Sequence, residues 1–172
     1  MPERHALLVD ANVLIDYLKS SISILSLANR YLGEIHVSTT VLDEVDGLDV
    51  GACERLGLNV IEPALAQVMR AAQRKGQLSF RDHLCLIVAL EEGFVCLSND
   101  KALRKACQTA GVATLWGLEV MVALVREGAM QAEDVIKVAE KIHAINPLHI
   151  SKQVLQKFTR LVTATETKDG TQ

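Results

Sequence analysis

Two acidic side chains come directly after apolar segments of this 172-residue sequence. Asp10 follows the run Leu-Leu-Val at 7–9, and Asp100 follows the segment 94–99, which begins as an apolar run. Such runs predict buried strands of a parallel sheet, in which ligands bind outside the carboxyl ends of the strands. We therefore expect both carboxylates at one edge of the sheet. Each acid also precedes a predicted helix, so capping of that helix is the alternative role.

A third acid, Asp82, lies three residues after Ser79, at the start of a predicted helix over 79–93. This spacing is typical of a capping box, in which the two side chains satisfy each other's backbone N–H groups. The local pattern supports a structural role and a catalytic role equally, and both stay open.

Four further acids follow one another in a short stretch: Asp43, Glu44, Asp46 and Asp49. Glu44 lies three residues after Val41 and four before Leu48, so it flanks the inward apolar stripe of a short helix. Asp43 has the spacing from Thr40 that a capping box requires. Glu44 is therefore the ligand candidate of this group, and we expect the acids on either side of it to be solvated.

Several carboxylates in one cleft repel one another unless a proton or a cation lies between them. Ligation by oxygen alone suits Mg²⁺ or Mn²⁺ better than zinc. Such a cation can polarise a phosphoryl oxygen and lower the pKa of bound water, as hydrolysis of a phosphodiester requires. The histidines, which have no metal-site spacing, are His5, His36, His83, His143 and His149. We expect them to be packing or surface residues, with His83 nearest to the site.

Basic residues adjoin two of these acids and could hold the phosphates of a polyanion. They are Arg70, Arg74, Lys75 and Arg81 near Asp82, and Lys101, Arg104 and Lys105 after Asp100. We select Arg74, Lys75, Arg81, Lys101 and Arg104 as phosphate contacts; solvated helix faces are the alternative. Lys and Arg number 4 against 10 Asp and Glu over residues 1–62, and 14 against 11 over 63–172. Acidic and basic regions could therefore meet across one cleft.

Alternating strand and helix patterns indicate the fold that must position these residues. Short apolar runs predict strands at 6–10, 34–37, 58–63, 94–100 and 112–116. Helical spacing predicts helices at 12–20, 21–32, 39–47, 64–76, 79–93, 101–111, 118–128, 132–145 and 150–162. Strands that are apolar throughout favour a parallel sheet covered by helices on both faces. The chain breaks at Asn146-Pro147, and we expect the polar segment 163–172 to fray.

The composition of the sequence limits the classes of protein to which the chain could belong. With 49% apolar residues, the chain can bury a full core as one domain. No apolar run reaches the roughly 18 residues that span a bilayer, and the first ten residues do not resemble a signal peptide, so we expect a soluble cytoplasmic protein. Cys53, Cys85, Cys96 and Cys107 lack metal-site spacing and are expected to be reduced core residues. With 3% aromatic residues there are few candidates for base stacking, and Trp116 is expected to be a core anchor.

Four segments, in this order and at these intervals, resemble the PIN-domain nucleases: LLVDANVLI, STTVLDEV, SFRDHLCLIVAL and VCLSNDKALRKACQTAGV. The resemblance implies a three-layer α/β/α fold with a central parallel sheet of four to five strands, plus C-terminal helices. The nuclease domain would span residues 1–145. A C-terminal helix and flexible tail over 146–172 would pack on the same domain.

The resemblance also implies a site. Asp10, Glu44, Asp82 and Asp100 would form a carboxylate quartet that binds Mg²⁺ or Mn²⁺. Asn12, two residues after the first acid, and Ser98, two residues before the last, would orient ligands or the nucleophilic water.

The activity that the resemblance implies is hydrolysis of RNA by a metal-dependent ribonuclease. Small members of the family are often VapC-type toxins, which are restrained by an antitoxin protein and often form homodimers. The helical extension beyond about Gly128 departs from the shortest such toxins. A PIN nuclease of RNA processing and a non-enzymatic RNA-binding or protein-binding module are the alternatives. A phosphatase with an Asp nucleophile is disfavoured, because Asp10-Ala11-Asn12 lacks the second acid of D-x-D.

Overall fold

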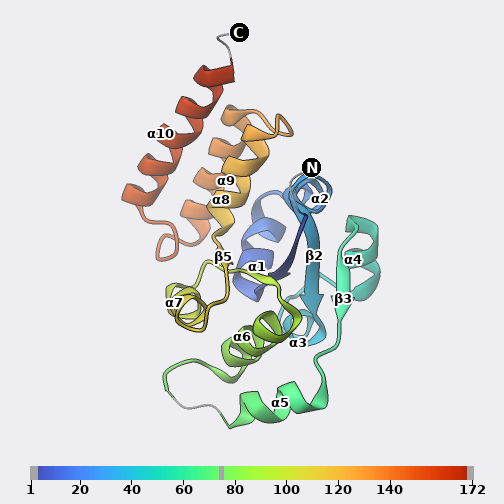
Figure 1. Cartoon of the computed structure of the whole chain (residues 1–172). Helices are drawn as coiled ribbons and strands as arrows, with labels where there is room; N and C mark the ends of the chain where they lie inside the picture. The colour runs from blue at the N-terminus through green and yellow to red at the C-terminus, as the bar shows by residue number, and fades with distance from the viewer. Residues whose placement is uncertain (1–3, 74–75, 170–172) are drawn as a thin grey trace.

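The computed structural model describes residues 4–73 and 76–169, which contain a five-stranded parallel sheet of order β3-β2-β1-β4-β5. The strands are β1 (His5–Val9), β2 (Gly33–Ser38), β3 (Asn59–Ile61), β4 (Val95–Leu97) and β5 (Thr114–Leu115). Because all four pairings are parallel, the carboxyl ends of these strands lie at one edge of the sheet (Figure 1). The predicted α/β class and parallel sheet are confirmed.

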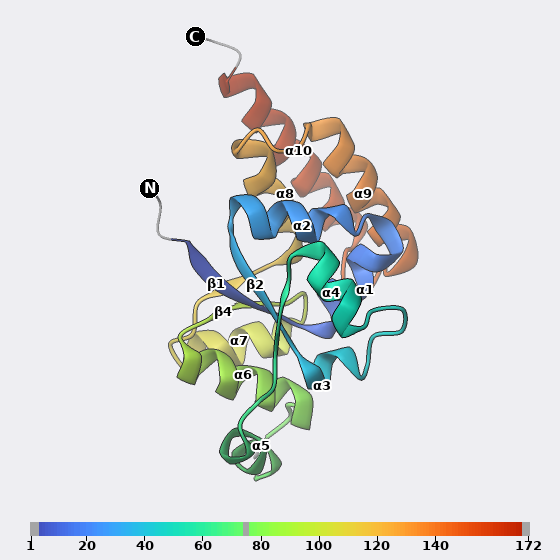
Figure 2. The same ribbon diagram turned by 90° about the vertical axis from the view of Figure 1, so that its right-hand side faces the viewer.

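Helices cover both faces of the sheet, as Figures 1 and 2 show. They are α1 (Ala11–Ser20), α2 (Ser23–Tyr31), α3 (Thr39–Leu42), α4 (Val50–Leu56), α5 (Leu65–Ala72), α6 (Phe80–Glu92), α7 (Lys101–Thr109), α8 (Gly117–Arg126), α9 (Ala132–Ile145) and α10 (Lys152–Asp169). Helices α1, α2, α8 and α9 supply the core on one face, and α5, α6 and α7 supply it on the other.

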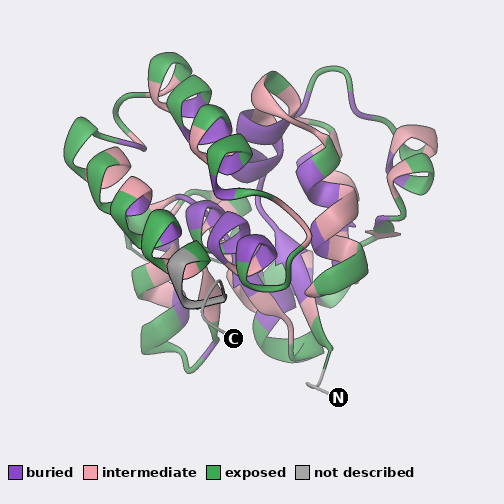
Figure 3. Cartoon of the chain, turned by 90° about the horizontal axis from the view of Figure 1, so that it is seen from above, coloured by how far each residue is buried: buried purple, intermediate pink, exposed green. Residues whose placement is uncertain are grey.

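The central strand β1 contributes to both cores because its side chains alternate. Leu7 and Val9 face the larger core, whereas Leu8 faces the smaller one. All three are at most 3% exposed, and in Figure 3 the buried, purple parts of the ribbon lie mainly toward the middle of the molecule. Burial of an aliphatic side chain stabilises a fold by roughly 1.5–3 kcal/mol. Burial on both faces explains why the strand is apolar at all three of these positions.

The register of β1 against β4 sets the position of the first acid. Val9 pairs with Leu97, and the backbone N–H of Asp10 donates to the carbonyl of Leu97 over 2.9 Å. The residues that follow these two strands are therefore brought side by side, although 88 positions separate Asp10 from Ser98.

The last helix, α10, extends further than the sequence pattern predicts. Helix α10 packs against α8 and α9 through buried Phe158 and Val162 and continues to Asp169, so the prediction that the chain frays from residue 163 is wrong up to that point. Residues 170–172 lie outside the described part of the chain. The extra turn is anchored by Glu166, which accepts the N–H of Ala132 at the start of α9 over 2.7 Å. A contact between two helices therefore allows α10 to continue through a polar sequence.

Two local predictions fail in the acidic segment after β2. Helix α3 ends at Leu42, and the hydroxyls of Thr40 and Ser38 are bonded to each other, so the expected capping box of Thr40 with Asp43 is not formed. Helix α4, which no pattern predicted, is capped by Asp49 and is only seven residues long. Short helices carry too little periodic signal to be recognised.

None of the helices in the described ranges has the length and apolarity needed to cross a membrane.

Candidate active site

Asp10 is both a helix cap and the centre of a polar cluster at the end of β1. Its Oδ1 accepts the N–H of Ala11 over 2.8 Å, which caps α1. Its Oδ2 accepts from Nδ2 of Asn12 over 2.8 Å and from Oγ of Ser98 over 3.0 Å. The two roles considered for this acid, capping and participation in a site, are therefore compatible.

The environment of Asp10 disfavours its charge. The side chain is 8% exposed, and this burial is the main reason that its pKa is raised from 3.8 to about 6. Hydrogen bonds from Ser98 and Ala11 lower the pKa, whereas the charges of Asp82 and Glu44 raise it further. Asp82 and Glu44 are therefore close enough to act on Asp10.

The turn Ser98–Asp100 joins the first and last acids. The buried Oγ of Ser98 donates to Asp10 and accepts the N–H of Asp100 over 3.0 Å. Asp100 caps α7, since its Oδ1 accepts the N–H of Leu103 over 2.7 Å. Oδ1 of Asn12 accepts the N–H of Asn99 over 3.0 Å. Asn12 and Ser98 thus tie the segments that carry Asp10 and Asp100 together.

Glu44 and Asp82 interact with Asp10 electrostatically. Their side chains form an ion pair or hydrogen bonds with other residues. Oε1 of Glu44 lies 2.7 Å from Nη1 of Arg81. Oδ2 of Asp82 accepts from Oγ of Ser79 over 2.7 Å, and the N–H of Asp82 donates back to the same Oγ over 3.1 Å. The capping box predicted for Asp82 is therefore present.

The donor set fits a hard divalent cation in its chemistry. All four acids offer carboxylate oxygens, and a cation would relieve the repulsion that raises the pKa of Asp10. In the described residues, however, no three His, Cys, Asp or Glu side chains are close enough to hold an ion as they stand. Ligation by all four would require Glu44 to leave Arg81 and Asp82 to turn from Ser79.

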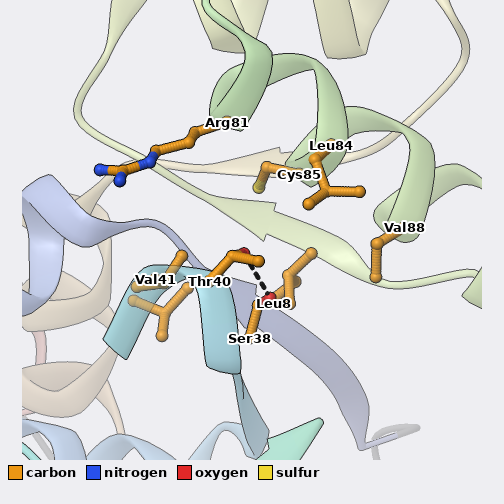
Figure 4. A pocket seen from close by; sticks show the side chains of 9 residues that line it. Leu8, Ser38, Thr40, Val41, Arg81, Leu84, Cys85 and Val88 are labelled. Atoms are coloured by element: carbon orange, nitrogen blue, oxygen red, sulfur yellow. Dashed lines mark hydrogen bonds between the residues drawn. The ribbon is translucent and has the colours of Figure 1, made fainter. Parts of the chain in front are cut away.

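A small, mainly apolar pocket lies beside the acids, between the ends of β1 and β2 and helix α6 (Figure 4). Arg81 extends from α6 on one side of it, and Thr40 and Val41 of α3 line the other side. Arg81 thereby bridges α6 to Glu44, the residue shortly after α3. One acid of the N-terminal part of the chain and one base of its remainder thus meet here.

The side chains predicted to contact phosphate differ in their exposure and in the partners that they already have. Arg81 is paired with Glu44, and Lys101 is exposed at the start of α7. Arg104 is half-buried, donates to the carbonyl of Ser98 over 3.0 Å and lies 5.1 Å from the ring centre of Trp116. Burial is the main cause that lowers the pKa of Arg104. The remaining two predicted contacts, Arg74 and Lys75, lie outside the described residues.

Two buried polar residues next to this cluster were missed by the sequence reasoning. Asp16 is 3% exposed and Asn99 is 8% exposed, and Nδ2 of Asn99 donates to Oδ2 of Asp16 over 2.7 Å. A signal existed, since Asp16 lies three residues after Val13 and one before Tyr17, on the apolar stripe of α1. A charge on such a stripe indicates a buried partner.

Comparisons with known proteins agree with this fold. A family model described as DUF3368, PIN domain, matches residues 6–164. A solved PilT N-terminus domain protein from the hyperthermophilic archaeon Sulfolobus solfataricus P2 has a similar fold, with a TM-score of 0.50 and 14% sequence identity over 69% of this chain and 92% of that chain. No curated protein matches the chain. The extent of the family match shows that the chain belongs to the PIN-domain family, whose members are generally metal-dependent nucleases.

Proposed function

We propose that this chain is an endoribonuclease that depends on Mg²⁺ or Mn²⁺ and hydrolyses RNA phosphodiester bonds. The observation that carries the proposal is the position of Asp10, buried at the carboxyl end of the central strand, bonded through Ser98 to the Asp100 turn and repelled by Glu44 and Asp82. Carboxylates that gather at the ligand-binding edge of a parallel sheet and repel one another are suited to share a cation.

In this proposal Asp10, Glu44, Asp82 and Asp100 hold the cation. When bound, the cation supplies a nucleophilic water and neutralises charge on the phosphate. Asn12 and Ser98 keep Oδ2 of Asp10 in a fixed orientation by donating to it. Because Asp10 is buried behind these donors, it cannot turn away from the site without losing two hydrogen bonds.

The basic residues would hold the flanking phosphates. Lys101 is free to swing toward a phosphate, and Arg81 becomes available when Glu44 binds the cation. Arg104 would have to keep its bond to the carbonyl of Ser98 and use its other N–H groups. We include Arg74 and Lys75 on the basis of sequence alone. Contacts of this kind recognise backbone charge and carry little sequence information.

The test is cleavage of a labelled single-stranded RNA, followed by gel or fluorescence in the presence of Mg²⁺, Mn²⁺ or excess chelator. Asp10→Asn and Asp100→Asn are expected to abolish cleavage while circular dichroism remains that of the folded protein. Asp134→Asn, at an exposed position on α9, is the matched control and should cleave normally. Cleavage that persists in the first two variants, or in chelator, would contradict the proposal.

We further propose that the cellular role is that of a toxin restrained by an antitoxin protein, and that the active form is a homodimer. A free ribonuclease that degrades cellular RNA should arrest growth when this chain is expressed alone, and Asp10→Asn should relieve the arrest. Normal growth with a demonstrably active enzyme would instead favour RNA processing. Light scattering of the purified chain tests the dimer, since a monomeric mass at micromolar concentration would exclude it.

A further inference from the structure

Asn99 is the residue of the Ser98–Asp100 turn whose side chain points into the protein, away from the four proposed metal ligands. Its Nδ2 donates to Oδ2 of Asp16 on α1 over 2.7 Å, and its Oδ1 accepts the N–H of Gly117, the first residue of α8, over 3.0 Å. The backbone N–H of Asn99 donates to Asn12, also on α1. One residue thus joins the turn to two helices.

The chemistry of these partners leaves one possible orientation for the amide. The carboxylate of Asp16 accepts, and the backbone N–H of Gly117 donates, so the side chain between them must offer one donor and one acceptor. Gly117 permits this close approach, because a Cβ on that residue would lie 2.8 Å from Oδ1 of Asn99. The amide therefore has no alternative flip.

Asp16 is itself held from its other side. Burial is the main cause raising the pKa of Asp16, and Asn146 and His149 lie near enough to lower it. Nδ2 of Asn146 is in turn 2.7 Å from Nδ1 of His149. Both residues lie between α9 and α10, so a continuous series of polar contacts runs from the turn to the base of the C-terminal helices.

We propose that Asn99 is a positioning residue of the nuclease site, whose side chain, clamped between Asp16 and Gly117, keeps Ser98 and Asp100 aligned with Asp10. This inference rests on the proposed function for its catalytic consequence. Asn99 bonds to no proposed metal ligand through its side chain, so it acts through the backbone of the turn. A misplacement of one ångström in a reacting group can reduce a rate by about a hundredfold.

Exchange of the amide and the carboxylate between positions 99 and 16 tests the clamp. Asn99→Asp removes the hydrogen-bond donor of this side chain, Nδ2, and places two carboxylates against each other. Asp16→Asn keeps a donor and an acceptor in contact, because the amide introduced at position 16 can accept from Asn99. The double variant restores the original pattern in reverse, since the amide at position 16 donates to the carboxylate at position 99, which still accepts from Gly117. Asn59→Asp, at an exposed position on β3, is the matched control.

The expected results separate alignment from folding. In Asn99→Asp, kcat on RNA falls by about tenfold to a hundredfold, while KM changes by less than about threefold because phosphate contacts are retained. In the double variant, kcat returns to within about threefold of the wild type. The loss in Asp16→Asn is smaller than that in Asn99→Asp. The control keeps the wild-type kcat.

A second readout needs neither metal nor substrate. Hydrogen exchange of the backbone amides of Asn99 and Asp100, measured by NMR in chelator, should become about tenfold faster in Asn99→Asp and slow again in the double variant. Unchanged kcat and unchanged exchange in Asn99→Asp would overturn the inference. A double variant that is folded but as impaired as Asn99→Asp would do the same.

Two further outcomes are distinguishable. If Asn99→Asp does not fold, Gly117→Ala takes its place, because its added methyl displaces Oδ1 of Asn99 at the first position of a helix, where alanine is well tolerated. Full kcat and unchanged exchange in Gly117→Ala would overturn the clamp. If the wild-type chain cleaves no RNA with either metal, the proposed function fails, and the exchange measurements alone decide whether Asn99 holds the turn.

Discussion

Arg81 on α6 lies 2.7 Å from Glu44, so a cation belonging to the protein neutralises one of the proposed metal ligands. The two side chains are 53% and 24% exposed. Solvent screens a pair of this kind, and its contribution to stability is under about 1 kcal/mol. In the proposed site its importance is for binding, because a metal ion and Arg81 would compete for the same carboxylate.

Arg81→Gln should therefore bind Mn²⁺ more tightly than the wild type, by a few-fold as an order of magnitude, because Glu44 no longer has a competing partner. KM for RNA should rise at the same time, since a phosphate contact is lost. Calorimetric titration with Mn²⁺ and steady-state kinetics measure the two effects. Arg55→Gln on α4, at an exposed position, serves as the control, and weaker Mn²⁺ binding in Arg81→Gln would contradict the competition.

The raised pKa of Asp10 makes the metal-free protein less stable at neutral pH. The folded state holds the proton of this acid up to about pH 6, whereas the unfolded chain releases it near 3.8. The free energy of unfolding therefore falls as pH rises from about 4 to above 6, by about 3 kcal/mol at one pKa unit per roughly 1.4 kcal/mol. Below pH 3.8 the carboxyl is protonated in both states and the penalty vanishes.

Asp10→Asn should accordingly melt at a higher temperature than the wild type at pH 7.5 in chelator, because it removes a buried charge. At pH 4 the difference should be much smaller. Addition of Mg²⁺ or Mn²⁺ should raise the melting temperature of the wild type and leave that of Asp10→Asn unchanged. Differential scanning fluorimetry across pH provides the comparison, and a variant that melts lower than the wild type at pH 7.5 would show that the hydrogen bonds to Asp10 outweigh its burial.

Ser98→Ala should weaken the site and the fold together. The hydroxyl is fully buried and bonds both to Oδ2 of Asp10 and to the N–H of Asp100. Its loss is expected to cost about 1.5–3 kcal/mol, the range for a hydrogen bond to a charged group, and to raise the pKa of Asp10 further. Urea denaturation and NMR titration of Asp10 measure these effects. An unchanged Asp10 titration would show that Ser98 does not support this carboxylate.

Phe158 and Leu161 on α10 provide a test of how firmly the last helix is attached. Phe158 is 4% exposed and Leu161 is 48% exposed. Phe158→Ala should lower the free energy of unfolding by about 3–5 kcal/mol because it leaves a cavity, whereas Leu161→Ala should cost less than about 1 kcal/mol. Equal effects in chemical denaturation would mean that α10 detaches before the rest of the chain unfolds.

The layers of the fold could be predicted because buried parallel strands are apolar at every position, as in Leu7, Leu8 and Val9. The end of α10 could not, because it depends on Glu166 reaching the start of α9, a contact that no local pattern contains. Helix α4 was not predicted because it is short. It follows a capping acid, Asp49, in a segment whose pattern also fits a solvated loop.

The site was predictable to the extent that it follows from strand ends. Asp10 and Asp100 close neighbouring strands, so their proximity follows from the strand order β1–β4. The electrostatic coupling of Glu44 and Asp82 to Asp10 depends on how α3 and α6 pack over the sheet, which spacing alone does not determine. Asn99 and Asp16 were overlooked because polar residues were considered as ligands, and these two have each other as partners.

The central strand β1 precedes its neighbour β4 by almost ninety residues along the chain, and the groups that hold the Asn99 side chain extend to Gly117. A nascent chain emerging from the ribosome therefore carries Asp10 long before it can assemble the remaining acids around it. In the proposed ribonuclease, this order of synthesis delays cleavage of RNA until the chain has been translated past Gly117.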